Sequence, residues 1–155
     1  MSETGKRLEQ LGINLPSKDR KGSGVVDAVI CDDLIYISAH LPLNAENKPA
    51  YVGKVGDTIS LDEAVQAARL CGINMLATIK DYIGDLDRVD YFVKILGLVN
   101  SAGDFSSQPA VINGFSDLLV EVFGKRGQHA RSAMGAFALP MNVPVVVDAI
   151  VRIRK

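Results

Sequence analysis

The chain has 155 residues, of which 48% are hydrophobic and 23% are charged, a composition that fits one folded domain and excludes intrinsic disorder. Its 17 basic and 18 acidic residues leave a net charge of -1, so no basic surplus favours nucleic acid as a partner. The N-terminus lacks the apolar core of a signal peptide, and no apolar run reaches bilayer length. We therefore expect a cytoplasmic protein without a membrane partner.

Residues 1–23 are expected to form an N-terminal extension, and residues 24–155 the domain itself. Leu8 and Leu11 give a short helix over 4–11 one apolar edge, and a polar connector with Pro and Gly follows. Two strand-like runs, 25–31 and 34–38, are separated by two aspartates, which is typical of a hairpin. A brief edge strand is expected over 51–56.

The middle of the chain predicts two helices that flank a long strand. Ser60 and Glu63 form a capping-box pattern, and apolar residues continue at helical spacing as far as Ile83. Residues 88–99 read as a central strand. A second amphipathic helix follows Pro109 and ends at Gly124 with cations, as helix C-termini favour.

The chain closes with two strands, 129–139 and 143–151, joined by a short Leu-Pro-Met-Asn turn. The element order predicts an α+β fold with two helices packed on one face of a mixed sheet. The other sheet face stays uncovered in such a subunit, so we expect the protein to associate with itself. Cys31 and Cys71 lack metal spacing and are expected to be two buried thiols in a reducing compartment.

Two charged residues interrupt the apolar run at the end of the chain, Arg131 in its first strand and Asp148 in its second. Neither type is normally buried without a partner. An arginine held on a strand suits bidentate binding of a carboxylate; alternatively, Arg131 reaches water or pairs with Asp148 as part of the scaffold. His40 follows a strand, where binding groups often gather, but a surface or capping role is the commoner one.

Familiar catalytic patterns do not occur in the sequence. It contains no Gly-rich phosphate loop, zinc-ligand spacing, Ser-His-Asp order or nucleophile elbow. We therefore expect no metal and no cofactor. Up to this point, the pattern describes a small α/β subunit with one unusual arginine.

From Gly24 to Ile153 the sequence resembles the RidA family of imine deaminases, also known as the endoribonuclease L-PSP family. The block around Arg131 resembles a divergent branch of that family. The segments that carry the resemblance are Ile37-Ser38-Ala39-His40-Leu41-Pro42-Leu43-Asn44, Gly103-Asp104-Phe105, Ile112-Asn113-Gly114-Phe115, Ala130-Arg131-Ser132 with Leu139-Pro140, and Asp148-Ala149-Ile150.

The resemblance implies a chorismate-mutase-like fold and a homotrimer whose three sheets line an inner barrel, with a cleft at each subunit boundary. In the family, the arginine that matches Arg131 binds the carboxylate of an imino acid. Asn113 matches an asparagine of the cleft, although it can also simply satisfy backbone groups at its helix start. Ser38 matches a polar position of a Ser-Gly-Gln segment, in which His40 here replaces the amide.

Two positions depart from the family pattern. The glutamate that orients water in the family falls on Val146, which cannot activate water, and the neighbouring acid falls on Asp148, on the same side of the strand. The family's cleft tyrosine falls on Val25. The half of the site that binds substrate is therefore expected to be present, and the hydrolytic half to be missing or remodelled.

Imine hydrolysis needs an oriented carbon, a held water and a group that moves a proton. The resemblance suggests Arg131 for orientation and Ser132 or Asn113 for the water. His129 and His40 are candidates for the proton step, and His129 shares the Arg131 side of its strand, where the nearby cation favours a neutral ring. A histidine beside a turn, such as His129, is more often merely exposed. Asp148 can act as a substitute acid or base, although pairing inside the sheet or the trimer is the commoner role for such a residue.

Three functions remain in competition. The first is a hydrolase of reactive enamines and imines, and the second is a non-catalytic trimer that binds a small carboxylate. The third, RNA cleavage, is suggested only by the older family name, and the absence of a basic surplus argues against it. Val146 favours the binder and Arg131 fits both of the first two; of these we favour the hydrolase.

Overall fold

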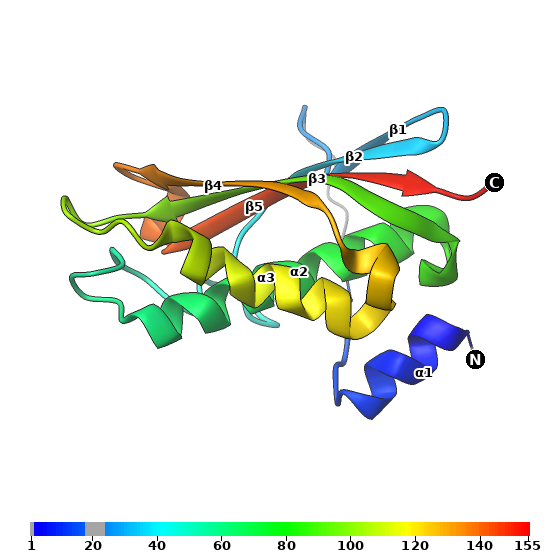
Figure 1. Ribbon diagram of the computed structural model, residues 1–155, viewed down its shortest axis with the longest axis horizontal. Coiled ribbons are helices and arrows are strands. Elements are labelled where there is room, and N and C mark those ends of the chain that lie inside the picture. Colours follow the sequence, from blue (N-terminus) through cyan, green and yellow to red (C-terminus); the bar gives the residue numbers. More distant parts are fainter. Residues whose placement is uncertain (1, 18–23) are drawn as a thin grey trace.

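The computed structural model describes residues 2–17 and 24–155. A five-stranded sheet of order β1-β2-β5-β3-β4 forms one layer, and the helices form a second layer on one of its faces (Figure 1). Residues 18–23 of the predicted connector lie outside the described residues. The elements are α1 (Glu3–Gln10), β1 (Ala28–Cys31), β2 (Leu34–His40), α2 (Leu61–Ile83), β3 (Val89–Asn100), α3 (Gln108–Phe123), β4 (Ala130–Ala136) and β5 (Val145–Ile153), with short 3-10 turns at Leu86–Arg88, Gly124–Gly127 and Pro140–Asn142.

The predicted α+β class and the two long helices are confirmed. The capping box that starts α2 is complete, because the Ser60 hydroxyl accepts from the Glu63 amide at 3.2 Å and the Glu63 carboxylate accepts from the Ser60 amide at 2.8 Å. The edge strand expected over 51–56 is wrong. Gly53 and Gly56 have positive φ angles of 133° and 89°, which break an extended run, and Val55 forms only isolated bridges.

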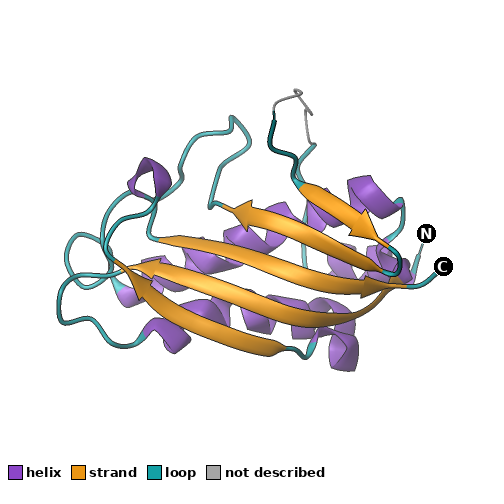
Figure 2. Ribbon diagram, turned by 90° about the horizontal axis from the view of Figure 1, so that it is seen from above, coloured by secondary structure: helices purple, strands orange, loops and turns teal. Residues whose placement is uncertain are grey.

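The last two strands are present but do not pair with each other. Strand β4 pairs in parallel with β3, whereas β5 lies between β2 and β3 and is antiparallel to both. The turn at Pro140–Asn142 therefore carries the chain past β3, as the sheet viewed from above shows (Figure 2). This arrangement leaves β4 at one edge of the sheet.

Strand register decides which face of the sheet each charged residue occupies. Arg131 is level with Ile95 and Ala149, whose side chains are buried under the helices. Asp148 is level with Leu96 and, through it, with Ser132, on the opposite face. Because neighbouring residues in register point the same way, Arg131 and Asp148 lie on opposite faces and are separated by β3. The expected alternative of an Arg131–Asp148 pair within one subunit is therefore wrong.

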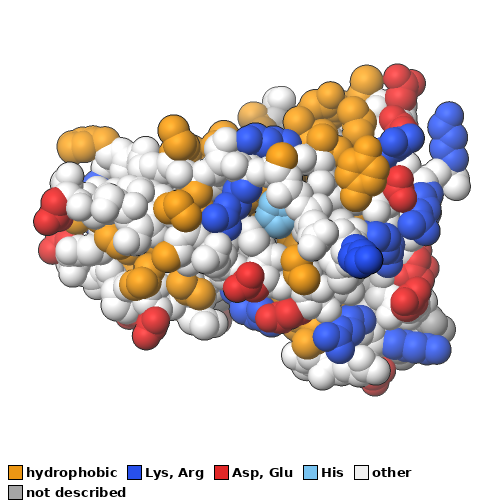
Figure 3. Space-filling view, in the orientation of Figure 1, with side chains coloured by type: hydrophobic (Ala, Val, Ile, Leu, Met, Phe, Trp, Pro, Cys, Tyr) orange, Lys and Arg blue, Asp and Glu red, His pale blue; other side chains and the backbone are white. Residues whose placement is uncertain are grey.

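One face of the sheet carries no helix, as predicted (Figure 1). Hydrophobic side chains gather over the sheet at the top of the space-filling view (Figure 3). On this outer face Val29, Tyr36 and Met134 are 55%, 45% and 56% exposed, respectively. A sheet face that stays apolar and open in the subunit is typical of a surface that another protein covers.

Helix α1 is fixed to the body at both ends. The Asp87 carboxylate accepts from the amides of Glu3 and Thr4, each at 2.8 Å, and from the Thr4 hydroxyl. Burial works to raise the pKa of Asp87, but these hydrogen bonds and nearby Arg126 bring it below its ordinary value. The Arg7 guanidinium donates to the Glu121 carbonyl at 2.8 Å, so the helix packs beside the end of α3.

The cysteines differ in exposure. Cys71 is buried in α2, and burial raises the pKa of its thiol, but Cys31 at the end of β1 is exposed. The prediction that both thiols are buried is therefore wrong for Cys31, which sits in the sheet's outermost hairpin.

Among the described residues, no helix is both long and apolar enough to span a bilayer.

Close packing of α3 on α2 provides a stability test. A Cβ added at Gly114 would lie 2.1 Å from the Val65 carbonyl oxygen of α2, a backbone atom that cannot move aside cheaply. We expect Gly114→Ala to lower the free energy of unfolding by about 1–3 kcal/mol, as overpacking typically does. Urea denaturation measures the change.

Gly103→Ala is the matched control, because nothing lies within 4 Å of its added Cβ. Its free energy of unfolding should stay within about 0.5 kcal/mol of the wild type. Equal effects of the two substitutions would contradict the close approach of the helices.

Candidate functional site

The candidate site lies where α3 runs beside the edge strand β4. The chain passes from β3 through α3 to β4, so one face of the helix lies next to the first residues of the strand. Asn113 and Ser116, one helical turn apart, present their side chains to the strand, and Arg131 and His129 reach them from the strand side. Asn113 is exposed and the other three are half-buried, so the cluster is open to solvent.

Neutral groups hold the Arg131 guanidinium. Its Nη1 donates to Asn113 Oδ1 at 2.8 Å and to Ser116 Oγ at 3.1 Å. Within residues 2–17 and 24–155, no carboxylate pairs with Arg131, and its Nε and Nη2 donate to no protein acceptor. Arginine carries five N–H donors in a planar fork, so three of them remain for an anion.

His129 is neutral in this cluster. Its Nδ1 lies 2.6 Å from the Gly127 carbonyl oxygen, which can only accept, so Nδ1 carries the proton. Its Nε2, 2.9 Å from Ser116 Oγ, then accepts from the hydroxyl. Burial lowers the pKa of His129; the Gly127 carbonyl opposes this shift, and the Arg131 charge adds to it.

The remaining predicted site residues lie elsewhere in the subunit. Ser132 is on the outer face, where it accepts from Lys94 Nζ at 2.7 Å. His40 is buried at 6% exposure, with Nδ1 2.7 Å from the Ser38 carbonyl oxygen and Nε2 2.7 Å from the Thr78 hydroxyl. The expected surface position of His40 is therefore wrong. Strand β2, which carries it, is separated from β4 by β5 and β3.

A second group of predicted residues shares a hollow on the outer face. Ser38, Asp148 and Val25 line a cavity of about 510 Å³ beside Tyr36 and Ile150. The Ser38 hydroxyl donates to the Val26 carbonyl at 2.7 Å. Burial raises the pKa of Asp148 toward neutral pH. A carboxyl group serves better as a general acid or base when its pKa lies closer to the working pH.

Thus one subunit holds two separate groups of residues. Arg131, Asn113 and His129 come together as a cluster at the sheet edge, and Ser38 and Asp148 come together on the outer face. Ser116, which joins Arg131 to His129, was not predicted. Its spacing of three residues from Asn113 was the available signal, because that spacing puts both side chains on one helix face.

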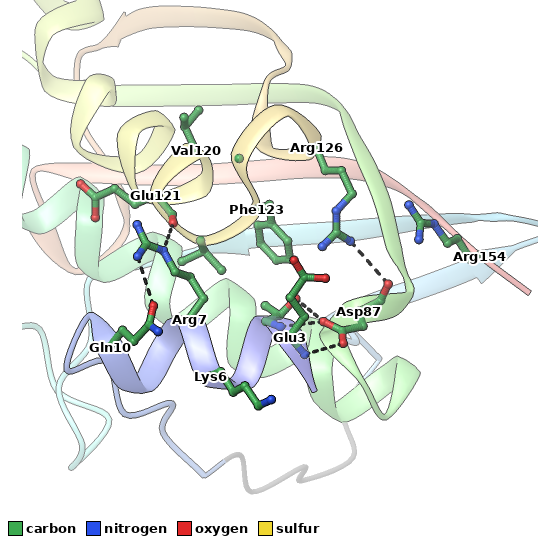
Figure 4. A pocket seen from close by; sticks show the side chains of 13 residues that line it. Glu3, Lys6, Arg7, Gln10, Asp87, Val120, Glu121, Phe123, Arg126 and Arg154 are labelled. Carbon is green, nitrogen blue, oxygen red and sulfur yellow. Dashed lines mark hydrogen bonds between the residues drawn. The ribbon is translucent and has the colours of Figure 1, made fainter. Parts of the chain in front are cut away.

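A larger cavity, of about 850 Å³, lies between α1 and the end of α3 (Figure 4). Its charged side chains already serve the fold: Arg126 donates to the Val89 carbonyl at 2.6 Å, Arg7 to Glu121, and Asp87 accepts from the start of α1. Because acidic and basic groups are mixed and largely engaged, this cavity offers no site for a ligand of one charge.

Among the described residues, no three potential metal ligands come together.

The sheet with helices on one face and an arginine held by neutral groups defines an α+β protein with a candidate anion site. The family described as "YjgF/chorismate_mutase-like, putative endoribonuclease" matches residues 6–152. Protein TCP17 of Trypanosoma cruzi is 37% identical over 147 residues, which cover 94% of this chain and 91% of that protein. The chain therefore belongs to the YjgF family, which includes the RidA proteins.

Solved structures agree with this assignment. Atu1372 of Agrobacterium tumefaciens, described as a protein with unknown function, superposes with a TM-score of 0.90 at 39% identity over 97% of this chain and 94% of its own. A "putative endoribonuclease" of Shewanella oneidensis gives 0.92 at 26% identity over 98% and 100% of the two chains. YyfA of Yersinia pestis, of the Rid family, shares the fold at a TM-score of 0.61 and 21% identity, over 90% and 94%.

The lowered pKa of His129 predicts a pH dependence of stability. The unfolded chain binds a proton near pH 6.5, whereas the folded chain binds it only at lower pH, so the free energy of unfolding falls as pH drops below about 6.5. His129→Gln should remove this part of the slope, which solvent screening of the half-exposed ring keeps well below the one-proton limit of about 1.4 kcal/mol per pH unit. Urea denaturation between pH 5 and 8 measures it. A wild-type and a variant curve that stay parallel would contradict the neutral, half-buried ring.

Proposed function

We propose that the protein binds small carboxylated metabolites at Arg131 and hydrolyses reactive enamines or imines to keto acids and ammonia. The observation that carries this proposal is the Arg131 guanidinium, held by Asn113 and Ser116 with three donors left over. Planar donors on a rigid support suit a carboxylate, which accepts two parallel hydrogen bonds. Membership of the family supports a general Rid-like function.

The reaction adds water to the imine carbon. The oxygen of the water forms the new carbon–oxygen bond, and both hydrogens of the water end on the nitrogen. The carbon–nitrogen bond then breaks, ammonia leaves, and the carbon becomes a keto group. Arg131 would bind the substrate carboxylate and so fix the carbon in place. Asp148 is the better candidate for carrying the proton. Burial raises the pKa of its carboxyl group, so the group exchanges a proton at a pH closer to neutral. His129 is less available, since both of its ring nitrogens are already engaged.

Arg131 and Asp148 can serve one ligand only if they come from different copies. They lie on opposite faces of the sheet in one subunit, separated by β3. A homotrimer that buries the outer sheet faces would bring the hollow of one copy, with Ser38 and Asp148, toward the β4 edge of the next. The apolar outer face supports this assembly.

A non-catalytic binder of small carboxylates is the second candidate. Val146, at the position of the family's water-orienting glutamate, lies on the outer face at 5% exposure and offers no polar atom. Neither candidate involves RNA, because a net charge of -1 gives the chain no basic surplus that would favour a phosphate backbone. Two free cysteines fit a reducing compartment such as the cytoplasm.

Hydrolysis is tested with 2-iminopropionate generated in situ by an amino-acid oxidase. The protein should speed formation of the keto acid, and Arg131→Ala should reduce this gain by about 100-fold or more, as loss of a bidentate charged contact does. Arg69→Ala is the matched control, since Arg69 pairs with Glu121 at 2.8 Å on the helical side and should leave the rate unchanged.

Equal rates with and without the protein would contradict the hydrolase. If calorimetry then shows that pyruvate binds to the wild type and not to Arg131→Ala, the binder is favoured. Absence of both effects would contradict both candidates.

Self-association is tested by analytical ultracentrifugation at micromolar concentration. We expect three times the subunit mass of 16.6 kDa. Val29→Asp should shift the protein toward monomers, because it places a charge on the apolar outer face. Leu61→Asp, at a site 41% exposed at the start of α2 in the helical layer, is the control and should leave the trimer intact. A wild-type mass of one subunit would overturn the shared cleft.

A further inference from the structure

We infer that Ser116 is a positioning residue, which together with Asn113 occupies the Nη1 group of Arg131 and leaves the Nε–Nη2 edge to bind the ligand carboxylate. This inference rests on the proposed carboxylate site and specifies how that site is oriented. It assigns a role to a residue on α3 that lies outside the sequence motifs.

The count of donors supports the assignment. Nη1 carries two hydrogens, and two acceptors meet it, Asn113 Oδ1 at 2.8 Å and Ser116 Oγ at 3.1 Å. Because the guanidinium is planar, fixing both hydrogens of one nitrogen fixes the plane of the whole group. The Nε–Nη2 edge, which donates to no acceptor among the described residues, is then held in one orientation. A carboxylate is the planar anion that matches two parallel donors on that edge.

His129 sets the direction of the Ser116 hydroxyl. Arg131 only donates, so Ser116 Oγ must accept from it and send its own hydrogen elsewhere. That hydrogen points to His129 Nε2 at 2.9 Å, whose lone pair is free because Nδ1 carries the proton toward the Gly127 carbonyl. The hydrogen bonds therefore run in one direction, from Arg131 through Ser116 to His129.

The far end of this chain of hydrogen bonds is fixed by packing. A Cβ at Gly127 would lie 2.1 Å from the Leu119 carbonyl oxygen, so the backbone that anchors the ring is pressed against α3. Pre-orientation reduces the entropy that a ligand must remove from a long, flexible arginine side chain. Loss of the Ser116 hydroxyl would leave Arg131 charged and present but held at Nη1 by Asn113 alone, so its guanidinium would turn more easily.

Calorimetry with pyruvate tests the effect on binding. We expect Ser116→Ala to weaken binding about tenfold, the typical consequence of losing one hydrogen bond to a charged group, and Ser116→Thr, which keeps the hydroxyl, to stay within about threefold. Ser107→Ala is the matched control, because the Ser107 hydroxyl at the start of α3 makes no capping bond. Equal affinities of wild type and Ser116→Ala would overturn the inference.

A measurement on the free protein separates this inference from the proposed function. Rotation of the Arg131 guanidinium about its Nε–Cζ bond, followed by NMR, should be slow in the wild type and in Ser116→Thr, and at least tenfold faster in Ser116→Ala. Ser116→Cys, which nearly keeps the side-chain volume but bonds weakly, should behave like alanine if Ser116→Ala fails to fold.

The outcomes are distinguishable. Slow rotation in a protein that binds no pyruvate would contradict the proposed function while the positioning of Arg131 stands. Equally fast rotation in the wild type and in Ser116→Ala would overturn the positioning even if pyruvate binds.

Discussion

The candidate site depends on a cation that neutral groups hold at the sheet edge. Arg131 is half-buried between α3 and β4, yet within the described residues its partners are an amide oxygen and a hydroxyl rather than a carboxylate. An internal ion pair would have satisfied the guanidinium and left little attraction for an anion. Neutral partners fix its position while its charge remains available to a ligand.

The order of the strands places this cation. Because β5 inserts between β2 and β3, strand β4 is left at the edge, paired only with β3. The parallel crossover through α3 then lays Asn113 and Ser116 along that edge. The same register puts Asp148 on the outer face. The cation that can orient a ligand and the carboxyl group with the raised pKa therefore lie on different faces of each subunit.

Elements governed by local pattern could be predicted from the sequence, and those governed by pairing could not. The capping box at Ser60 and the apolar periodicity specified α2, and the two aspartates after Cys31 specified the first hairpin. The pattern of the last two strands was equally clear. Which strands they pair with could not be predicted, because both pair with β3 and sequence spacing does not encode the position of β3 in the sheet. His40 lies in the core, where its ring contacts the Thr78 hydroxyl on α2. Local pattern could not predict this contact, because the two residues are 38 positions apart in the chain.

The most direct test of the central claim is a crystal structure of the protein with pyruvate bound. We predict electron density for the carboxylate against the Nε–Nη2 edge of Arg131, in a cleft whose other wall is the outer face of a second copy. Density for pyruvate away from Arg131, or an Arg131 side chain closed into an ion pair with no cleft beside it, would contradict the account.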